Sequence, residues 1–197
     1  PLWYKNEVDA NKNPTGKRVT TNDYGSADYY YVDKSSLPKV YGGFNTSLSW
    51  KGFDLSAIFA YSIGGYIYNR DVTMILHNGS LEGRDWSTEI LRRWTPDNRY
   101  TDVPALSTTS NNWNSASTRF LQNNSYMRLK NLTLSYNLPK QWISKLSLSS
   151  VQVYVQGDNL FTIHRNQGLD PEQGITGITY YRYPAMRTIS GGINVSF

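Results

Sequence analysis

The chain of 197 residues has no cysteine, only two histidines and no long hydrophobic run. Without cysteine, neither a disulfide framework nor a thiolate metal site can be proposed. No stretch approaches the roughly 18 consecutive apolar residues that a transmembrane helix needs. These absences exclude a helical membrane span and a disulfide-stabilised fold. They leave a membrane β-barrel open, because barrel strands carry their apolar residues only in alternation.

The sequence also lacks a recognisable pattern of catalytic or metal-binding residues. His77 and His164 both fall in expected loops, and neither a Ser/His/Asp order nor an HExxH spacing surrounds them. Asp170 and Glu172 could hold a calcium ion through oxygen ligands, but an Asp-Pro pair more often serves the geometry of a turn. We therefore predict that the chain is not an enzyme and has no catalytic residue, metal site or cofactor.

Clusters of basic residues are missing as well. The net charge is +5, yet no basic run is longer than Arg92-Arg93. A nucleic-acid-binding face normally shows clustered Lys and Arg, so we predict no nucleic-acid partner. Positive charge suits a surface facing anionic lipid head groups, and it equally suits an ordinary solvated surface. The first residues show neither an initiator Met nor a signal peptide, so we expect an internal piece of a longer polypeptide.

Aromatic residues are abundant, at 14% of the chain, and five segments alternate between apolar and polar residues. This period of two indicates strands of a sheet with two unlike faces. In the last segment, Ile189, Ile193 and Val195 alternate with Ser190, Asn194 and Ser196. Each segment has about ten residues, the length of a tilted membrane strand. The five expected strands are 41–50, 53–62, 126–136, 150–161 and 187–197.

The segment 126–136 changes phase in its middle. Its apolar residues are odd-numbered up to Leu129 and even-numbered from Leu132 onward. A β-bulge near Lys130-Asn131 would return all of them to one face, because one extra residue restores the phase. Alternatively, Arg128 and Lys130 simply point into a polar interior near one end.

Alternation alone does not separate a membrane barrel from a soluble sandwich. Aromatic residues at the strand ends favour the barrel, since two aromatic girdles are expected at the two membrane interfaces. We expect the apolar face to contact lipid and the polar face to line the lumen. One girdle would hold Trp50, Phe53, Tyr136 and Phe197, and the other Tyr41, Tyr61, Tyr126 and Phe161. Val151, Val153, Val155, Ile193 and Val195 should face lipid, and Gln152, Gln156, Asn194 and Ser196 the lumen.

The expected connections alternate in length. Residues 51–52 and 139–149 form short connections, and residues 63–124 and 162–185 form long ones. Outer-membrane barrels have short periplasmic turns and long external loops. We therefore place the long loops outside the cell. We expect a short helical piece at 86–94 within the first long loop, and a helical turn at 141–145 within the short connection 139–149.

Several motifs resemble the C-terminal end of SusC/RagA-family TonB-dependent outer-membrane transporters. None is decisive alone, but their order and spacing are specific, and the match covers nearly the whole chain from Leu37 onward. They are KGFDLS at 51–56, RWTPDN at 93–98, YMRLKNLTLSYNLP at 126–139, QGDNLFT at 156–162, GLDPE at 168–172, and YP at 183–184 with RT at 187–188 before the terminal Phe197.

The resemblance implies an all-β fold: the last five or so strands of a 22-stranded antiparallel transmembrane barrel with long external loops. Residues 1–39 would be an external loop segment, and residues 40–197 the C-terminal barrel strands. The plug domain and the TonB-contacting segment of the family lie outside this sequence. The resemblance also implies an outer-membrane location, partnership with a SusD-like surface lipoprotein and the TonB complex, and import of glycan oligosaccharides or, in some members, peptides. A soluble β-sandwich that binds carbohydrate remains the alternative.

Five aromatic residues are the candidate functional positions. Loop aromatics stack on sugar rings, anchor protein partners or pack within their loops, and the sequence does not choose among these roles. The terminal Phe197 either anchors the strand at the membrane interface or serves as an assembly signal for the barrel-assembly machinery, as the resemblance implies. The candidate loop residues are Tyr30, Trp113, Tyr180 and Tyr181.

Overall fold

The computed structural model describes residues 2–79, 81–107, 112–166, 168, 170–172, 174–179 and 181–197. The chain divides into two compact units. The first unit, called the loop unit here, comprises Pro1–Lys34, Tyr68–Leu121 and Ile178–Tyr181. The second unit, the sheet unit, comprises Ser35–Ile67, Gln122–Gly177 and Arg182–Phe197.

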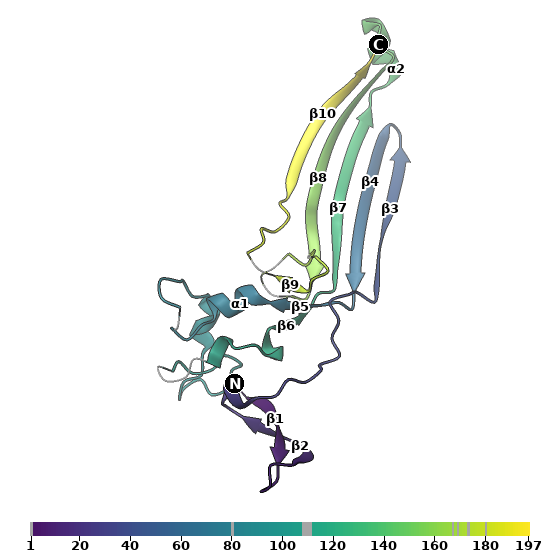
Figure 1. Cartoon of the computed structure of the whole chain (residues 1–197). Coiled ribbons are helices and arrows are strands. Elements are labelled where there is room, and N and C mark those ends of the chain that lie inside the picture. Colours follow the sequence, from purple (N-terminus) through teal and green to yellow (C-terminus); the bar gives the residue numbers. More distant parts are fainter. Residues whose placement is uncertain are drawn as a thin grey trace. The chain divides into compact units, whose positions relative to one another are not determined.

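The sheet unit contains a five-stranded antiparallel sheet (Figure 1). The order of its strands, β10-β8-β7-β4-β3, follows the order of the chain, so each strand pairs with its neighbours in sequence. All five expected strands are confirmed within a few residues. They are β3 (Val40–Trp50), β4 (Phe53–Ile63), β7 (Tyr126–Asn137), β8 (Ser150–His164) and β10 (Thr188–Ser196).

A β-bulge interrupts β7 at the predicted place. Ile58 pairs with Asn131 and Phe59 pairs with Leu129, so Lys130 has no partner in β4. The bulge puts Met127 and Leu129 on the same face as Leu132, Leu134 and Tyr136, because these five residues pair with alternate residues of β4. Strand β8 has its own irregularity opposite the bulge, where Asn159 takes the left-handed conformation with φ of 53°. The sequence pattern did not indicate this second irregularity.

One face of the sheet is apolar and largely uncovered. Cross-strand rows such as Leu55–Leu134–Val155 and Tyr136–Val153–Ile193 run across it. Side chains that would be buried in a soluble protein stay exposed in this chain, among them Trp50 at 63%, Val155 at 48% and Ile193 at 64%. An exposed patch of this extent marks a surface that is covered by another apolar phase or partner.

The opposite face is polar and internally hydrogen-bonded. Near the end with the short connections, a chain of side-chain hydrogen bonds crosses all five strands. The chain links Ser49 to Asp54, Asp54 to Asn137, Asn137 to Gln152 and Gln152 to Asn194, with donor–acceptor distances of 2.5 to 3.2 Å. Such polar groups are satisfied within the sheet and would be costly to place in hydrocarbon.

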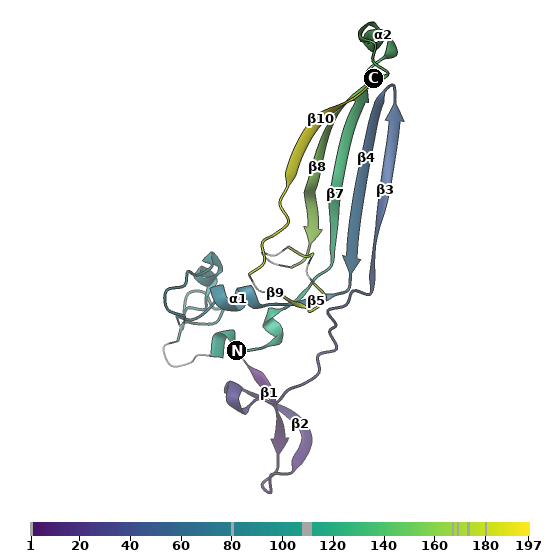
Figure 2. The same ribbon diagram turned by 45° about the horizontal axis from the view of Figure 1, so that its top comes forward.

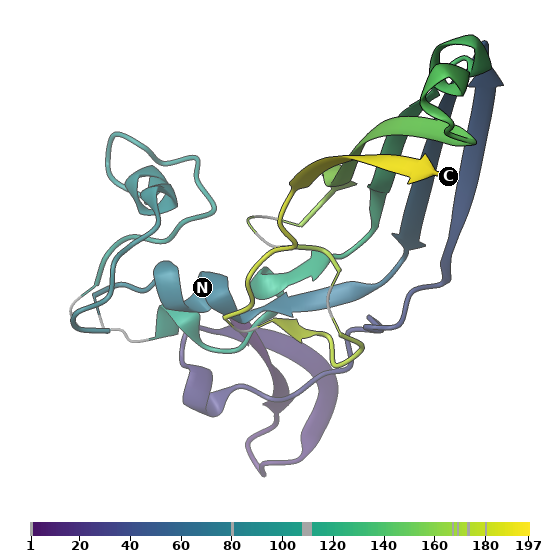
Figure 3. The ribbon, with the colours of Figure 1, turned by 90° about the horizontal axis from the view of Figure 1, so that it is seen from above.

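Two short connections lie at one end of the sheet (Figure 2). Lys51 and Gly52 both have positive φ, 48° and 88°, which is the geometry of a tight type I′ hairpin turn. Helix α2 (Lys140–Ile143) and the 3₁₀ turn η5 (Ser144–Leu146) join β7 to β8, confirming the expected helical turn. The C-terminal residues of β10 run beside β8 toward this same end (Figure 3).

The loop unit contains a β-hairpin, a small helix and several 3₁₀ turns. The hairpin pairs β1 (Trp3–Val8) with β2 (Pro14–Thr21), within the 39 residues that the sequence placed in a loop. A small cluster of Leu76, Ile90 and Val103 forms a core. The turn η2 (Thr88–Arg92) falls within the helical piece expected at 86–94. The other elements here are η1 (Tyr24–Ser26), α1 (Arg70–Ile75), η3 (Asn112–Asn114), η4 (Thr118–Phe120) and β9 (Ile178–Thr179).

Two short strands, β5 (Tyr66–Asn69) and β6 (Leu121–Asn123), complete the elements of the chain. The end of β5 pairs in parallel with β9, Tyr68 opposite Ile178 and Asn69 opposite Thr179. Among the described residues, no helix has the length and apolar character needed to cross a membrane.

Candidate functional site

Arg128 fixes a loop to the polar face of the sheet. It pairs with Ala60 of β4 and Thr162 of β8, and only 4% of its side chain is exposed. Its guanidinium lies 2.5 Å from Asp170 Oδ1 and 2.9 Å from Glu172 Oε2, and it donates to Thr162 Oγ1 at 3.0 Å. Arginine suits this position because its planar fork donates several hydrogen bonds and stays charged when buried. We call Arg128, Asp170, Glu172 and Lys130 the loop clamp.

The bulge residue Lys130 completes the loop clamp. Its Nζ lies 2.5 and 2.7 Å from the two carboxylate oxygens of Glu172. Asp170 also accepts hydrogen bonds from the amide of Glu172 at 2.9 Å and from the amide of Ala185 at 2.6 Å. The Asp170 carboxylate thereby holds two parts of the loop before β10. One part is residues 170–172, near its beginning, and the other is residue 185, near its end.

The pKa of the Asp170 carboxyl is lowered from its ordinary value of 3.8. Burial acts in the opposite direction and would raise the pKa by disfavouring the charged form. The hydrogen bonds from the Ala185 amide, Arg128 and the Glu172 amide outweigh burial, because each favours the carboxylate. Asp170 is therefore ionised at neutral pH and holds the loop as an anion.

The two carboxylates that were considered as calcium ligands are already paired with cations. Arg128 binds both of them and Lys130 binds Glu172, so a calcium ion would have to displace two basic groups. The residues that the structure describes include no group of three or more His, Cys, Asp or Glu side chains arranged to hold a metal. The Asp-Pro-Glu segment instead forms a turn whose acidic side chains bind the strand.

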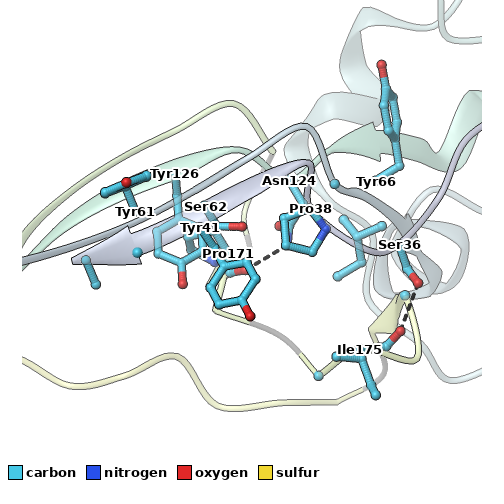
Figure 4. Close-up of a pocket in the computed structure, with 16 residues that line it drawn as sticks. Ser36, Pro38, Tyr41, Tyr61, Ser62, Tyr66, Asn124, Tyr126, Pro171 and Ile175 are labelled. Carbon is cyan, nitrogen blue, oxygen red and sulfur yellow. Dashed lines mark hydrogen bonds between the residues drawn. The ribbon is translucent and has the colours of Figure 1, made fainter.

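A pocket of about 300 Å³ lies beside the loop clamp, where β3, β4 and β7 meet their loops. Tyr41 of β3 pairs with Ser62 of β4, and Ser62 pairs with Tyr126 of β7. The three residues therefore form one row on the polar face, with a small serine between two tyrosines. Figure 4 shows this row together with the loop residues that line the pocket.

Hydrogen bonds between loop residues hold the outer wall of the pocket. Asn124 Nδ2 donates to the carbonyl oxygen of Pro171 at 2.8 Å, and Ser36 Oγ donates to that of Ile175 at 2.8 Å (Figure 4). Asn124 Oδ1 accepts from the amide group of Asn166 at 3.0 Å. Pro171 lies between the two acidic residues of the loop clamp, so the clamp also positions part of this wall.

The pocket corrects the expected position of two aromatic residues. Trp50, Phe53 and Tyr136 form a row on the apolar face, as a girdle requires. Tyr41 and Tyr126 were assigned to the second girdle, but their pairing with Ser62 puts them on the polar face. Successive side chains of a strand point to opposite faces of the sheet. A residue at the end of a strand therefore takes the face set by whether its number is odd or even, even where it lies at the level of a membrane interface.

The candidate loop aromatics are spread over the loop unit. Tyr30 packs within the hairpin region: its ring contacts Tyr4 edge-on, lies beneath the Arg18 guanidinium, and its hydroxyl donates to Asn6. Tyr181 is 61% exposed and its hydroxyl accepts from Arg84.

The structure describes the other candidates to different extents. Trp113 lies in η3, but its side chain falls outside the described set, and Tyr180 lies outside the described residues altogether. Phe197 is 92% exposed at the end of the chain. Of the candidates whose side chains are described, Tyr30 and Tyr181 contact different neighbours within the loop unit.

The sequence pointed to Asp170 and Glu172 as possible calcium ligands, but it did not predict that they pair with Arg128. The sequence does contain a signal for this pairing. Arg128 lies within a strand, and a charged residue that becomes buried needs a partner of opposite charge. Asp170 and Glu172 are the only acidic residues between positions 162 and 185. The pocket had no such signal, since it depends on how loops fold back onto the sheet.

Known proteins similar to this chain include TonB-dependent receptors and a peptide transport complex. The chain is 34% identical over 166 residues to TonB-dependent receptor P3 of Formosa agariphila. The aligned region covers 79% of this chain and 16% of that protein. It is 27% identical over 198 residues to TonB-dependent receptor SusC of Bacteroides thetaiotaomicron, covering 98% of this chain and 19% of SusC. No family model matches the chain.

The fold agrees with a solved structure along the whole chain. The RagAB peptide transporter matches with a TM-score of 0.81 and 36% identity, covering 100% of this chain and 21% of the matched one. The chain is a segment of a SusC/RagA-family TonB-dependent receptor. It spans about a fifth of the length of the relatives it matches.

Membership of the SusC/RagA family settles two of the expectations from sequence. TonB-dependent receptors are transporters and not enzymes, which confirms that this chain is not an enzyme. They are also outer-membrane β-barrel proteins, which confirms the outer membrane as the location. The antiparallel, mostly β architecture agrees with this family.

Proposed function

We propose that this chain forms part of the wall of an outer-membrane transporter that imports glycan oligosaccharides together with a SusD-like surface lipoprotein. The observation that carries the membrane-wall part of the proposal is the single amphipathic sheet, whose apolar face stays exposed while its polar face is hydrogen-bonded and bears a clamped loop. The glycan cargo follows from the resemblance to the family. A soluble sandwich would bury that apolar face against a second sheet. In a membrane, lipid covers it instead.

The sheet belongs to a closed barrel. Strands β3 and β10 are the outer strands of its order, and an open sheet edge in hydrocarbon leaves backbone groups without partners. The remaining strands of a 22-stranded barrel, contributed by the rest of the polypeptide, supply those partners. In this arrangement residues 40–197 are the C-terminal barrel strands, and the plug and TonB-contacting segments lie elsewhere in the protein.

The orientation of the two faces tests the membrane assignment directly. The sequence contains no cysteine, so single cysteines can be placed along β8 and β10 of the full-length receptor once any others are removed. Nitroxide labels at 151, 153, 155, 193 and 195 should be accessible to oxygen dissolved in lipid. Labels at 152, 156, 194 and 196 should be accessible to a water-soluble nickel reagent. The reverse pattern would overturn the assignment.

The long loops are proposed to lie outside the cell and to contact the lipoprotein. This follows from the alternation of short and long connections, because short turns of outer-membrane barrels lie on the periplasmic side. Energy coupling through the TonB complex would use the parts of the receptor that precede these strands.

Peptides are the second candidate cargo. The 36% identity to the RagAB peptide transporter along the whole chain supports it. A growth assay distinguishes the two cargoes. A host that lacks the full-length receptor should not grow on neutral oligosaccharides as sole carbon source, and it should grow normally on oligopeptides. The opposite result would identify a peptide importer.

A further inference from the structure

The tyrosine pocket on the polar face consists of groups that suit an uncharged ligand. None of the 16 described residues that line it carries a charge, and Tyr41 and Tyr126 of the polar face are among them. This contrasts with the loop clamp, where four charged residues lie close together but bind one another. A ligand that enters the pocket therefore meets aromatic rings, hydroxyl groups and backbone, with no ion to pair with.

The row Tyr41–Ser62–Tyr126 gives the pocket the shape of a slot. Adjacent strands lie about 4.8 Å apart, so two residues separated by one strand lie about 10 Å apart at their backbones. Ser62, the residue between them, is too small to fill that space. A slot with aromatic side walls and a hydroxyl at its floor accepts a flat ring with apolar faces and polar edges.

The loop residues beside the slot are held in place before a ligand arrives. Asn124 is bonded to both Pro171 and Asn166, and Ser36 is bonded to Ile175. Tyr41 is 77% exposed in this segment of the receptor. A preformed loop wall reduces the entropy cost of binding.

We propose that this slot is a binding subsite for one ring of a neutral oligosaccharide, with Tyr41 and Tyr126 stacking on the sugar faces above Ser62. The proposal rests on the proposed function of glycan import and adds where in the barrel the glycan is held. A pyranose has two apolar faces rimmed by hydroxyl groups, which matches aromatic walls and a hydroxyl floor. A charged sugar or a charged peptide would enter without a counter-ion and is disfavoured.

The test uses the full-length receptor purified from outer membranes. The probes are neutral hexasaccharides of glucose, mannose, galactose and xylose, and a neutral hexapeptide, with binding measured by titration calorimetry. Tyr41→Ala and Tyr126→Ala should each weaken binding of the preferred hexasaccharide about tenfold, which corresponds to one lost stacking contact. Tyr126→Phe should retain most of the affinity, since the ring remains.

Two controls keep the result specific to the slot. Tyr183→Ala removes a tyrosine that is 97% exposed and does not line the pocket, so its affinity should match the unchanged receptor. Ser62→Trp fills the slot and should abolish the same binding. Heat-modifiable migration of each variant in gels verifies that the barrel is folded.

The possible results separate the subsite from the proposed function. Binding of a hexasaccharide that none of the slot variants weakens would overturn the subsite and leave glycan import standing. Binding of no hexasaccharide by the unchanged receptor would overturn glycan import and the subsite with it. Hexapeptide binding that is lost in the slot variants would show the slot to hold peptides, which also overturns the proposal.

Discussion

At the scale of the residue, Arg128 is the most consequential side chain of the polar face. It is buried among polar partners and satisfies two carboxylates that would otherwise be left close together. Arg128→Met should release the loop between β8 and β10, because breaking a buried ion pair by removing one partner costs about 3–5 kcal/mol. Limited proteolysis of the receptor in outer-membrane vesicles should then show new cleavage between residues 165 and 187.

Arg92 supplies a matched control for Arg128. It also pairs with two carboxylates, those of Glu89 and Asp102, but its side chain is 55% exposed. Exposed pairs are worth about 0–1 kcal/mol, so Arg92→Met should leave the proteolysis pattern unchanged. Equal sensitivity of both variants would mean that the loop clamp has no special role.

Asp170 makes loop attachment sensitive to acid. Because its pKa is lowered in the folded chain, its contribution to stability is present above the ordinary value of 3.8 and is lost as pH falls through the lowered value. Hydrogen exchange of residues 168–187, corrected for intrinsic rates, should therefore rise only below pH 3.8. In Asp170→Asn, exchange should be raised at neutral pH and show no such acid step. A step in the variant at the same pH would assign the transition to another group.

Phe197 remains a prediction at the residue scale. It is 92% exposed at the end of the chain, consistent with both an interfacial anchor and an assembly signal. Phe197→Ser should slow insertion severely if the ring is recognised during assembly. Loss of an anchor alone would lower the stability of normally inserted barrel by about 2–3 kcal/mol. Surface-exposed receptor measured soon after induction distinguishes the two, and normal early levels would exclude the signal role.

At the scale of the element, the bulge in β7 keeps the two faces of the sheet distinct. Deleting Lys130 shifts one half of β7 by one residue relative to the other half. Either the residues before the bulge or those after it, Leu132, Leu134 and Tyr136, then turn to the wrong face. Each polar group moved into hydrocarbon costs several kcal/mol, so little barrel should be inserted. Lys130→Ala keeps the extra residue, and its inserted level should be close to that of the unchanged receptor. Outer-membrane fractions analysed by immunoblot provide the measurement.

Elements with a strict period were predictable from sequence, and irregular ones were not. The five strands and the bulge follow from the parity of residues such as Leu129 and Leu132, because alternation states which face each residue takes. The hairpin of β1 and β2 was missed because Trp3, Tyr4 and Val8 are mixed with charged residues and give no clear alternation. The irregularity at Asn159 was missed because a left-handed residue leaves little trace in apolar patterning.

At the scale of the whole molecule, the family and the outer-membrane location were predictable, whereas the pocket was not. Motif order along the chain identified the family, and alternation identified the strands. The pocket brings together Ser36, Ser62, Asn124 and Ile175, whose proximity depends on loop folding. No local pattern records such distant contacts.

The external loops carry the remaining prediction for the whole receptor. Deleting residues 111–117, the first of which lies outside the described part of the chain, should weaken capture of the SusD-like lipoprotein without preventing barrel assembly. Co-purification of the lipoprotein with the tagged receptor measures this, and an unchanged yield would remove these residues from the interface. Deleting the exposed Gly83 from the same long loop serves as the control.

The chain-ordered sheet has a consequence for how quickly it forms. Each strand pairs with the next strand of this sheet along the chain, but residues 64–125 separate β4 from its partner β7. The β3–β4 hairpin closes through two residues, and hairpins of this kind form in about 1–10 μs. The two long loops cost little closure entropy, about 0.6 kcal/mol for each doubling of length, but they make the β4–β7 and β8–β10 pairings non-local and therefore slow. The two local hairpins, β3–β4 and β7–β8, can therefore form before the non-local pairings that join them to each other and to β10.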